Sequence, residues 1–265
     1  AHEIRELAAK KHRSMPCPFR PGKCSKKGGV CSLRCYTDED GSVSPVPGTL
    51  VATCPNRFYE DDIVFKWAAE TLIHCSKPEI LTELPFLVAP GESSAANTAV
   101  GRIDMVLLDP SVNSPMNWCA LEMQAVYFSG GSITSELKDL QKYSGEGTPF
   151  PKGQRRPDFR SSGPKRLMPQ LQIKVPTITR WGKKTAVVID RCFWDSMGEM
   201  STVQNVSNCD IAWFVVDFRE NGGRFQACKH GVYLTTLDRA VEGLTAGVPT
   251  SLQQFEAELK ERIKG

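Results

Sequence analysis

The chain has 265 residues, of which 40% are hydrophobic and 24% are charged, and its formal net charge at pH 7 is +3. This composition is typical of a globular protein with one large domain, or with one core and a small appended module. The apolar runs are shorter than the roughly 20 residues of a membrane-spanning helix, which excludes an integral helical membrane protein. A mildly basic charge is compatible with nucleic-acid binding but does not require it.

Residues 1–57 are the first unit that the sequence predicts. A short helix with a basic end is expected over 1–13, and the N-terminus lacks the apolar stretch of a signal peptide. Residues 14–57 are rich in proline and glycine, show little helical or strand periodicity, and hold five of the ten cysteines. Because so many turn formers cannot build a hydrophobic core, we expect a bound metal to order this unit.

Residues 58–265 carry the apolar patterns of a packed core. Helices are predicted over 58–75, from 132 or 134 to about 143, and over 166–181 and 251–264. Strands are predicted over 84–89, 100–108, 117–127, 185–193 and 211–219, with a turn at 113–115. This order predicts an α/β fold in which helices flank a mixed central sheet.

Residues 144–166 are predicted to be a loop, because glycine and proline recur along them. The loop carries six cationic side chains: Lys152, Arg155, Arg156, Arg160, Lys165 and Arg166. Arginine can bind the O6 and N7 atoms of guanine bidentately, so the three arginines at 155, 156 and 160 are candidates for reading G·C pairs. A solvated basic loop with no DNA contact is an equally good interpretation.

Three oxygen-bearing side chains in the middle of the chain have the spacing of a metal site. Asp104 lies in an apolar run, and Glu122 and Gln124 follow two residues apart. Side chains at i and i+2 of a strand share a face, so Glu122 and Gln124 are expected to point together, toward Asp104 if its strand is the neighbour. Such groups suit Mg²⁺, although the same pattern occurs by chance at solvated edges of α/β proteins.

The cysteines of the first unit suggest a second metal site. Four thiolates can enclose zinc or iron tetrahedrally, and five cysteines lie between positions 17 and 54. The remaining five are scattered through apolar surroundings, where cysteine usually behaves as a small buried hydrophobe.

The segments Cys17-Pro-Phe19, Cys24, Gly29-Val-Cys31 and Cys54-Pro-Asn-Arg57 resemble the cysteine framework of the NotI restriction endonuclease family. The resemblance implies that Cys17, Cys24, Cys31 and Cys54 bind a structural metal, iron rather than zinc, and it leaves Cys35 free. Residues 117–124 are similar to that family's variant of the PD-(D/E)xK nuclease motif, in which glutamine replaces the final lysine.

The resemblance also implies a role for each residue of the central set. Asp104 and Glu122 would bind Mg²⁺, and Gln124 would contact the metal, a water or the phosphate. The backbone carbonyl of Met123 is a weaker candidate ligand, and Asp62 or Glu70 could add a further carboxylate.

The function implied is that of a type II restriction endonuclease of the bacterial cytoplasm. It would hydrolyse double-stranded DNA at a palindrome, GC-rich according to the family and the arginines, and leave 5′-phosphates. A palindrome cut on both strands implies a two-fold homodimer, with no membrane partner. Two alternatives remain: a non-catalytic DNA-binding protein ordered by its cysteine-bound metal, and a repair nuclease of the same fold without sequence specificity.

Overall fold

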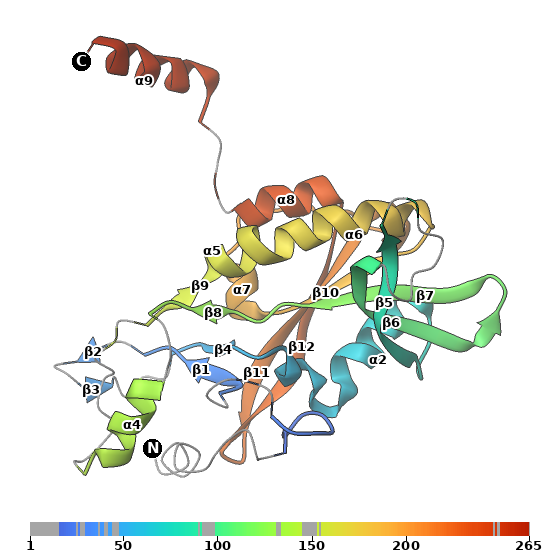
Figure 1. Ribbon diagram of the computed structural model, residues 1–265, viewed down its shortest axis with the longest axis horizontal. Helices are drawn as coiled ribbons and strands as arrows, with labels where there is room; N and C mark the ends of the chain where they lie inside the picture. The colour runs from blue at the N-terminus through green and yellow to red at the C-terminus, as the bar shows by residue number, and fades with distance from the viewer. Residues whose placement is uncertain are drawn as a thin grey trace.

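The computed structural model describes residues 16–24, 26, 30–36, 38–39, 42–43, 48–89, 91, 99–130, 134–144, 153, 155–245, 247 and 250–264 (Figure 1). The helix predicted over 1–13 lies outside these ranges, as does Lys152. Within the described residues, no helix is long and apolar enough to cross a membrane.

A six-stranded mixed sheet forms the centre of the molecule and confirms the predicted sheet type. Its strands, in spatial order, are β12 (Arg224–Thr235), β11 (Ile211–Asn221), β10 (Thr185–Asp190), β7 (Met116–Met123), β6 (Ala99–Asn113) and β5 (Glu79–Val88). β10 runs parallel to both β7 and β11, and the other pairs are antiparallel. Every residue of β10 is buried, as expected for a parallel strand covered on both faces.

Helices cover both faces of this sheet (Figure 1). On one face, α2 (Ile63–Ile73) packs its buried alanines and Phe65 against the side chains of β6, β7, β10 and β11. On the other face lie α6 (Met168–Arg180), α7 (Arg191–Asp195) and α8 (Leu237–Thr245). The two layers bury separate apolar clusters, so alternate residues of each central strand belong to different cores.

Asp190 ties the proline-rich N-terminal unit to the sheet. Its side chain, 1% exposed, accepts hydrogen bonds from the backbone N–H of Ala52 at 2.8 Å and of Phe193 at 2.7 Å. Ala52 ends β4 (Leu50–Ala52), which pairs with β1 (Ser32–Arg34). One carboxylate therefore caps α7 and fixes the inner strand of the N-terminal unit.

Arg57 makes a second tie between the same parts of the chain. Its guanidinium, 3% exposed, lies 2.6 Å from Glu60 and donates to the carbonyl of Phe225 at 2.5 Å. The rings of Phe19 and Phe218 lie 4.6 Å and 4.7 Å from its central carbon. Arg57 thus joins the N-terminal unit to β11 and β12 through a paired charge and two cation–π contacts.

The helix predicted over 58–75 is divided in the structure. A 3₁₀ segment, η2 (Pro55–Asp62), precedes α2. Asp61 and Asp62 separate the two, with φ angles of 53° and 55° in the left-handed region. Aspartate tolerates this region better than most residues, which explains why the chain turns there.

The predicted loop at 144–166 is helical from Phe159 onward. α5 (Phe159–Ser162) is capped by Asp158, whose side chain accepts from the N–H of Ser161 at 2.9 Å. A single π-helical segment, η3 (Gly163–Leu167), then leads into α6. The prediction of a loop was wrong for this part because Pro164 stands near the start of a helical segment, where a missing N–H costs little. Arg160, Lys165 and Arg166 consequently lie on helical turns.

The remaining differences concern the ends of the sheet. β12 and α8 were not predicted, and β10 ends at Asp190 because α7 begins there. β12 follows β11 through Gly222 and Gly223, both with positive φ, in a tight hairpin. The predicted helices near 134–143 and over 251–264 are confirmed as α4 (Thr134–Lys142) and α9 (Leu252–Lys264).

Replacing Asp190→Asn should lower the free energy of unfolding by about 1–3 kcal/mol, because the amide cannot accept from both N–H groups. Urea denaturation at pH 7.5 measures the change. Asp195→Asn is the control, since the side chain of Asp195 is 59% exposed and should change stability by less than about 0.5 kcal/mol. Equal stability of the two variants would contradict the role given to Asp190.

Candidate active site

Asp104 and Glu122 lie directly opposite each other on neighbouring strands. β6 and β7 are antiparallel, and Met105 pairs with Leu121. The next position along each strand therefore sets Asp104 against Glu122. The prediction that the strand of Asp104 adjoins that of Glu122 is confirmed.

The two carboxylates differ sharply in exposure. Glu122 is 2% exposed, whereas the side chain of Asp104 is 46% exposed. Leu121 packs in the core beneath α2, so Glu122 must face the opposite layer, which contains α6. Ala120, on the same face as Glu122, packs in a cluster with Ile178 of α6. The pair thus extends from the protein interior beneath α6, where Glu122 lies, to the surface, where Asp104 lies.

Lys174 of α6 completes this set and was missed by the sequence analysis. Its Nζ lies 2.6 Å from Glu122 Oε1 and 2.8 Å from Asp104 Oδ1, and the residue is 6% exposed. The signal was present in the helix pattern: Lys174 falls between Leu171 and Ile178, on the apolar stripe that faces the sheet. A lysine on such a stripe needs a buried anionic partner.

Burial shifts the ionisation of this cluster. Burial, the largest effect, and the negative charge of Asp104 together raise the pKa of Glu122 to about 8 against the opposing effect of Lys174. Burial acts to lower the pKa of Lys174, but the two carboxylates outweigh it and the net shift is upward. Lys174 therefore stays charged, and Glu122 holds its proton to an unusually high pH.

Gln124 continues the strand but does not contact the carboxylates. Its backbone N–H donates to the carbonyl of Val188 at 3.0 Å, which extends the pairing of β7 with β10. Its side-chain Nε2 donates to the carbonyl of Ala125 at 2.6 Å. The structure therefore brings Asp104 and Glu122 together and turns the amide of Gln124 toward the neighbouring backbone.

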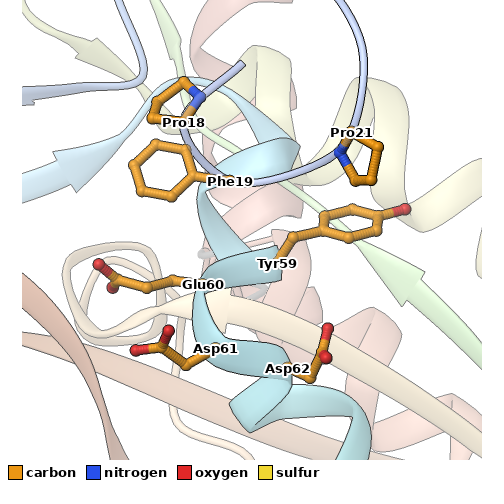
Figure 2. A pocket seen from close by; sticks show the side chains of 7 residues that line it. All are labelled: Pro18, Phe19, Pro21, Tyr59, Glu60, Asp61 and Asp62. Atoms are coloured by element: carbon orange, nitrogen blue, oxygen red, sulfur yellow. The ribbon is translucent and has the colours of Figure 1, made fainter. Parts of the chain in front are cut away.

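The two carboxylates considered as additions belong to a different layer. Glu70 is an exposed residue of α2, which packs against the face of the sheet opposite to Glu122. Asp62 ends η2 and lines an open cavity of about 390 Å³ with Tyr59, Glu60 and Asp61 (Figure 2). The prolines and Phe19 of the N-terminal unit form its other wall. This acidic cavity includes neither Asp104 nor Glu122.

The four framework cysteines lie within electrostatic reach of one another. Burial, followed by the charges of Cys54, Cys17 and Cys24, raises the pKa of Cys31 to about 11. The carbonyl of Cys31 also accepts from the N–H of Cys54 at 3.2 Å. Among the residues that the structure describes, no three histidine, cysteine or acidic side chains are close enough to form a metal site. The thiols are neighbours, but they do not form a closed coordination sphere.

Cys35 has different surroundings. Burial raises its pKa, and the charge of Asp190 raises it further. It packs beside Cys192 and Phe159 in the core below α6. Cys35 therefore contributes to packing between the N-terminal unit and the sheet.

Basic residues near β8 (Tyr127–Phe128) and β9 (Pro157–Asp158) fall into two groups. The guanidinium of Arg155 binds Glu136 of α4 twice, at 2.7 Å and 3.0 Å. Arg156, Arg160, Lys165 and Arg166 are exposed, and Arg166 lies over the ring of Tyr127 at 3.9 Å. To read a base, Arg155 would have to leave Glu136, whereas the other four already face solvent.

Comparison with known proteins finds a family to which the sequence is similar. A family model described as "Restriction endonuclease NotI" matches residues 4–227. The match includes the five N-terminal cysteines, both carboxylates, Gln124 and Lys174, and it ends within β12. No curated protein matches the chain.

Glu122→Gln should change how stability depends on pH. The folded-state pKa of Glu122, about 8, exceeds the ordinary value of 4.5 for a glutamate, so between these values the native state binds more protons than the unfolded state. The wild type should therefore lose up to about 1.4 kcal/mol per pH unit from this group as the pH rises through that window. The variant should lack this contribution.

Urea denaturation of the metal-free wild type and variant at pH 5, 6.5 and 8 measures the effect. Asp109→Asn, on the neighbouring strand β6, is the control, because Asp109 is only partly buried and its hydrogen bonds with Ser111 lower its pKa, away from this window. Parallel stability curves for the wild type and Glu122→Gln would show that Glu122 does not titrate in this window.

Proposed function

The chain belongs to the NotI restriction endonuclease family, and on that premise we propose that it is a type II enzyme that cuts duplex DNA at a specific palindrome. The reaction proposed is Mg²⁺-dependent hydrolysis of the phosphodiester bond that leaves 5′-phosphates. The observation that carries the proposal is the facing pair of Asp104 and Glu122 on adjacent strands. The pair reaches the surface at Asp104, where a DNA backbone has access.

The donor chemistry of the pair fits a hard divalent cation. Two carboxylates supply oxygen ligands of the kind Mg²⁺ prefers, and the buried Glu122 needs a positive charge beside it. When bound, Mg²⁺ lowers the pKa of a coordinated water and stabilises the charge on the phosphate. Asp104, half-exposed, would orient the metal toward DNA, and Gln124 would offer its amide to the water or phosphate if it left Ala125.

A structural metal in the N-terminal unit is part of the proposal. Cys17, Cys24, Cys31 and Cys54 would bind iron or zinc, because soft thiolates favour these metals. The mutual effect of the four thiols on the pKa of Cys31 supports this set. Metal binding would release their protons and contract the unit around the ion.

The exposed basic side chains would contact DNA. Arg156 directly precedes β9, Arg160 lies in α5, and Lys165 and Arg166 lie in η3. Phosphate contacts from such residues give affinity, and bidentate arginine contacts to guanine give a preference for a GC-rich site. A palindromic site then requires two copies of the chain related by a two-fold axis.

Incubation of the protein with genomic DNA and Mg²⁺ should give discrete fragments, and Asp104→Asn or Glu122→Gln should reduce cleavage at least about 100-fold. Agarose electrophoresis and run-off sequencing of the products measure activity and reveal the site. Asp109→Asn should cut like the wild type.

Other outcomes of this experiment favour the alternatives. A smear instead of bands would indicate a nuclease without sequence specificity. Salt-dependent DNA binding without cleavage by the wild type would indicate a non-catalytic binding protein.

Purified Cys31→Ala should contain less than half the iron or zinc of the wild type, because three thiolates hold the ion more weakly than four. Elemental analysis by mass spectrometry gives the metal content per chain. Cys35→Ala is the matched control and should retain the metal, since Cys35 faces Asp190. Metal loss in Cys35→Ala but not in Cys31→Ala would reverse the assignment.

A further inference from the structure

Lys174 is a buried cation in direct contact with both proposed metal ligands. Its Nζ bridges Asp104 Oδ1 and Glu122 Oε1 at 2.8 Å and 2.6 Å. The side chain is only 8% exposed, and α6 is held against the sheet by Leu171 and Val175. The ammonium is therefore fixed in place by the packing of its helix.

Stability alone does not account for a lysine at this position. A buried ion pair recovers little more than its own desolvation cost, and apolar residues of similar volume commonly replace such pairs without loss of stability. The neighbours of Lys174 on the helix stripe are apolar, so apolar residues in place of the whole cluster would continue the pattern. Loss of the lysine alone would leave Glu122 without its cation. Lys174 also forms an ion pair with the half-exposed Asp104, so its charge can take part in chemistry at the surface as well as in packing.

The contacts of Lys174 leave groups available on both sides. An ammonium has three N–H donors, of which the two carboxylates take two. Each carboxylate uses one oxygen for Lys174, which leaves the second oxygen of each, Asp104 Oδ2 and Glu122 Oε2, as the atoms that a divalent cation would bind in place of a proton. The cluster would then hold the lysine and the metal together, and the ammonium would keep one N–H for a third group.

Gln124 cannot supply this charge. A carboxamide carries no charge at any pH of interest, and its NH₂ here donates to the carbonyl of Ala125. The strand that carries Glu122 thus brings no cation to the site, and α6 brings one from the layer above.

We propose that Lys174 is a catalytic residue, the second cation of the active site, which shares Asp104 and Glu122 with the divalent metal and donates its third N–H to the scissile phosphate. This inference rests on the proposed nuclease function and deepens it. The ammonium stabilises negative charge on the phosphate oxygens as water attacks. It also repels the metal that binds the same carboxylates, so the two cations oppose each other's binding.

The test compares Lys174→Met, Lys174→Gln and Lys174→Arg with the wild type. Lys184→Met is the control, because Lys184 is a partly buried lysine whose Nζ donates to the carbonyls of Ser207 and Cys209 and lies away from the carboxylates. Cleavage is measured at saturating Mg²⁺ on DNA that carries the wild-type site. Mn²⁺ affinity is measured separately by calorimetry, and folding of each variant is checked by circular dichroism.

Lys174→Met and Lys174→Gln should cleave at least about 100-fold more slowly, with DNA affinity in Ca²⁺ unchanged within threefold. Both should bind Mn²⁺ at least about fivefold more tightly, because a competing positive charge is gone. Lys174→Arg should restore part of the rate, and Lys184→Met should match the wild type. A lysine with only a structural role would instead lower stability and weaken Mn²⁺ binding together.

Two results would overturn the inference while the proposed function stands. One is cleavage by folded Lys174→Met or Lys174→Gln within threefold of the wild type. The other is unchanged or weaker Mn²⁺ binding in both variants. The proposed active site itself would be refuted by a wild type that neither cuts DNA nor binds Mn²⁺. It would also be refuted if Glu122→Gln bound Mn²⁺ as tightly as the wild type.

Discussion

The structure depends on a carboxyl group buried in its central sheet. Glu122 lies on β7, between β6 and β10, with 2% of its surface exposed. Charge there is costly unless a cation or a proton compensates it, and Asp104 on the next strand increases the cost. The compensating charge comes from α6, so the position of that helix and the chemistry of the sheet are linked.

This link explains why one layer of the molecule is built around α6. The helix buries Leu171, Val175 and Ile178 against the sheet, and that packing sets the height and rotation at which Lys174 reaches the carboxylates. Arg160, Lys165 and Arg166 precede α6 on the short helical segments α5 and η3. Groups suited to DNA contact thus lie directly before the helix that carries the cation beside the carboxylates.

The N-terminal unit is joined to this framework both by polar ties and by buried apolar residues. Asp190 accepts from the backbone of β4, and Arg57 is enclosed between two aromatic rings and Glu60. Val51 and Ala52 of β4 are each fully buried in one of the two core clusters. Asp190 and Arg57 both belong to the region matched by the family model.

Most of the central elements could be predicted from the sequence, because their apolar runs are buried on one or two faces. β10 and β11 contain nearly continuous runs of hydrophobic residues, and the runs in β6 and β7 are only slightly less continuous. β12 was missed because it is an edge strand with charged, half-exposed positions that obscure its alternation. The helical turns from Phe159 were missed because their proline and glycine resemble loop signals.

The sequence by itself determined that Glu122 and Gln124 stand two residues apart in one apolar run, that Asp104 lies in another, and that five cysteines gather between positions 17 and 54. Strand periodicity and spacing are local properties, so they can be read along the chain. Only the tertiary structure decided that Lys174 meets the carboxylates, that Arg155 binds Glu136 and that Cys35 faces Asp190. These contacts join distant segments, and they depend on how helices and sheet pack, which no local pattern specifies.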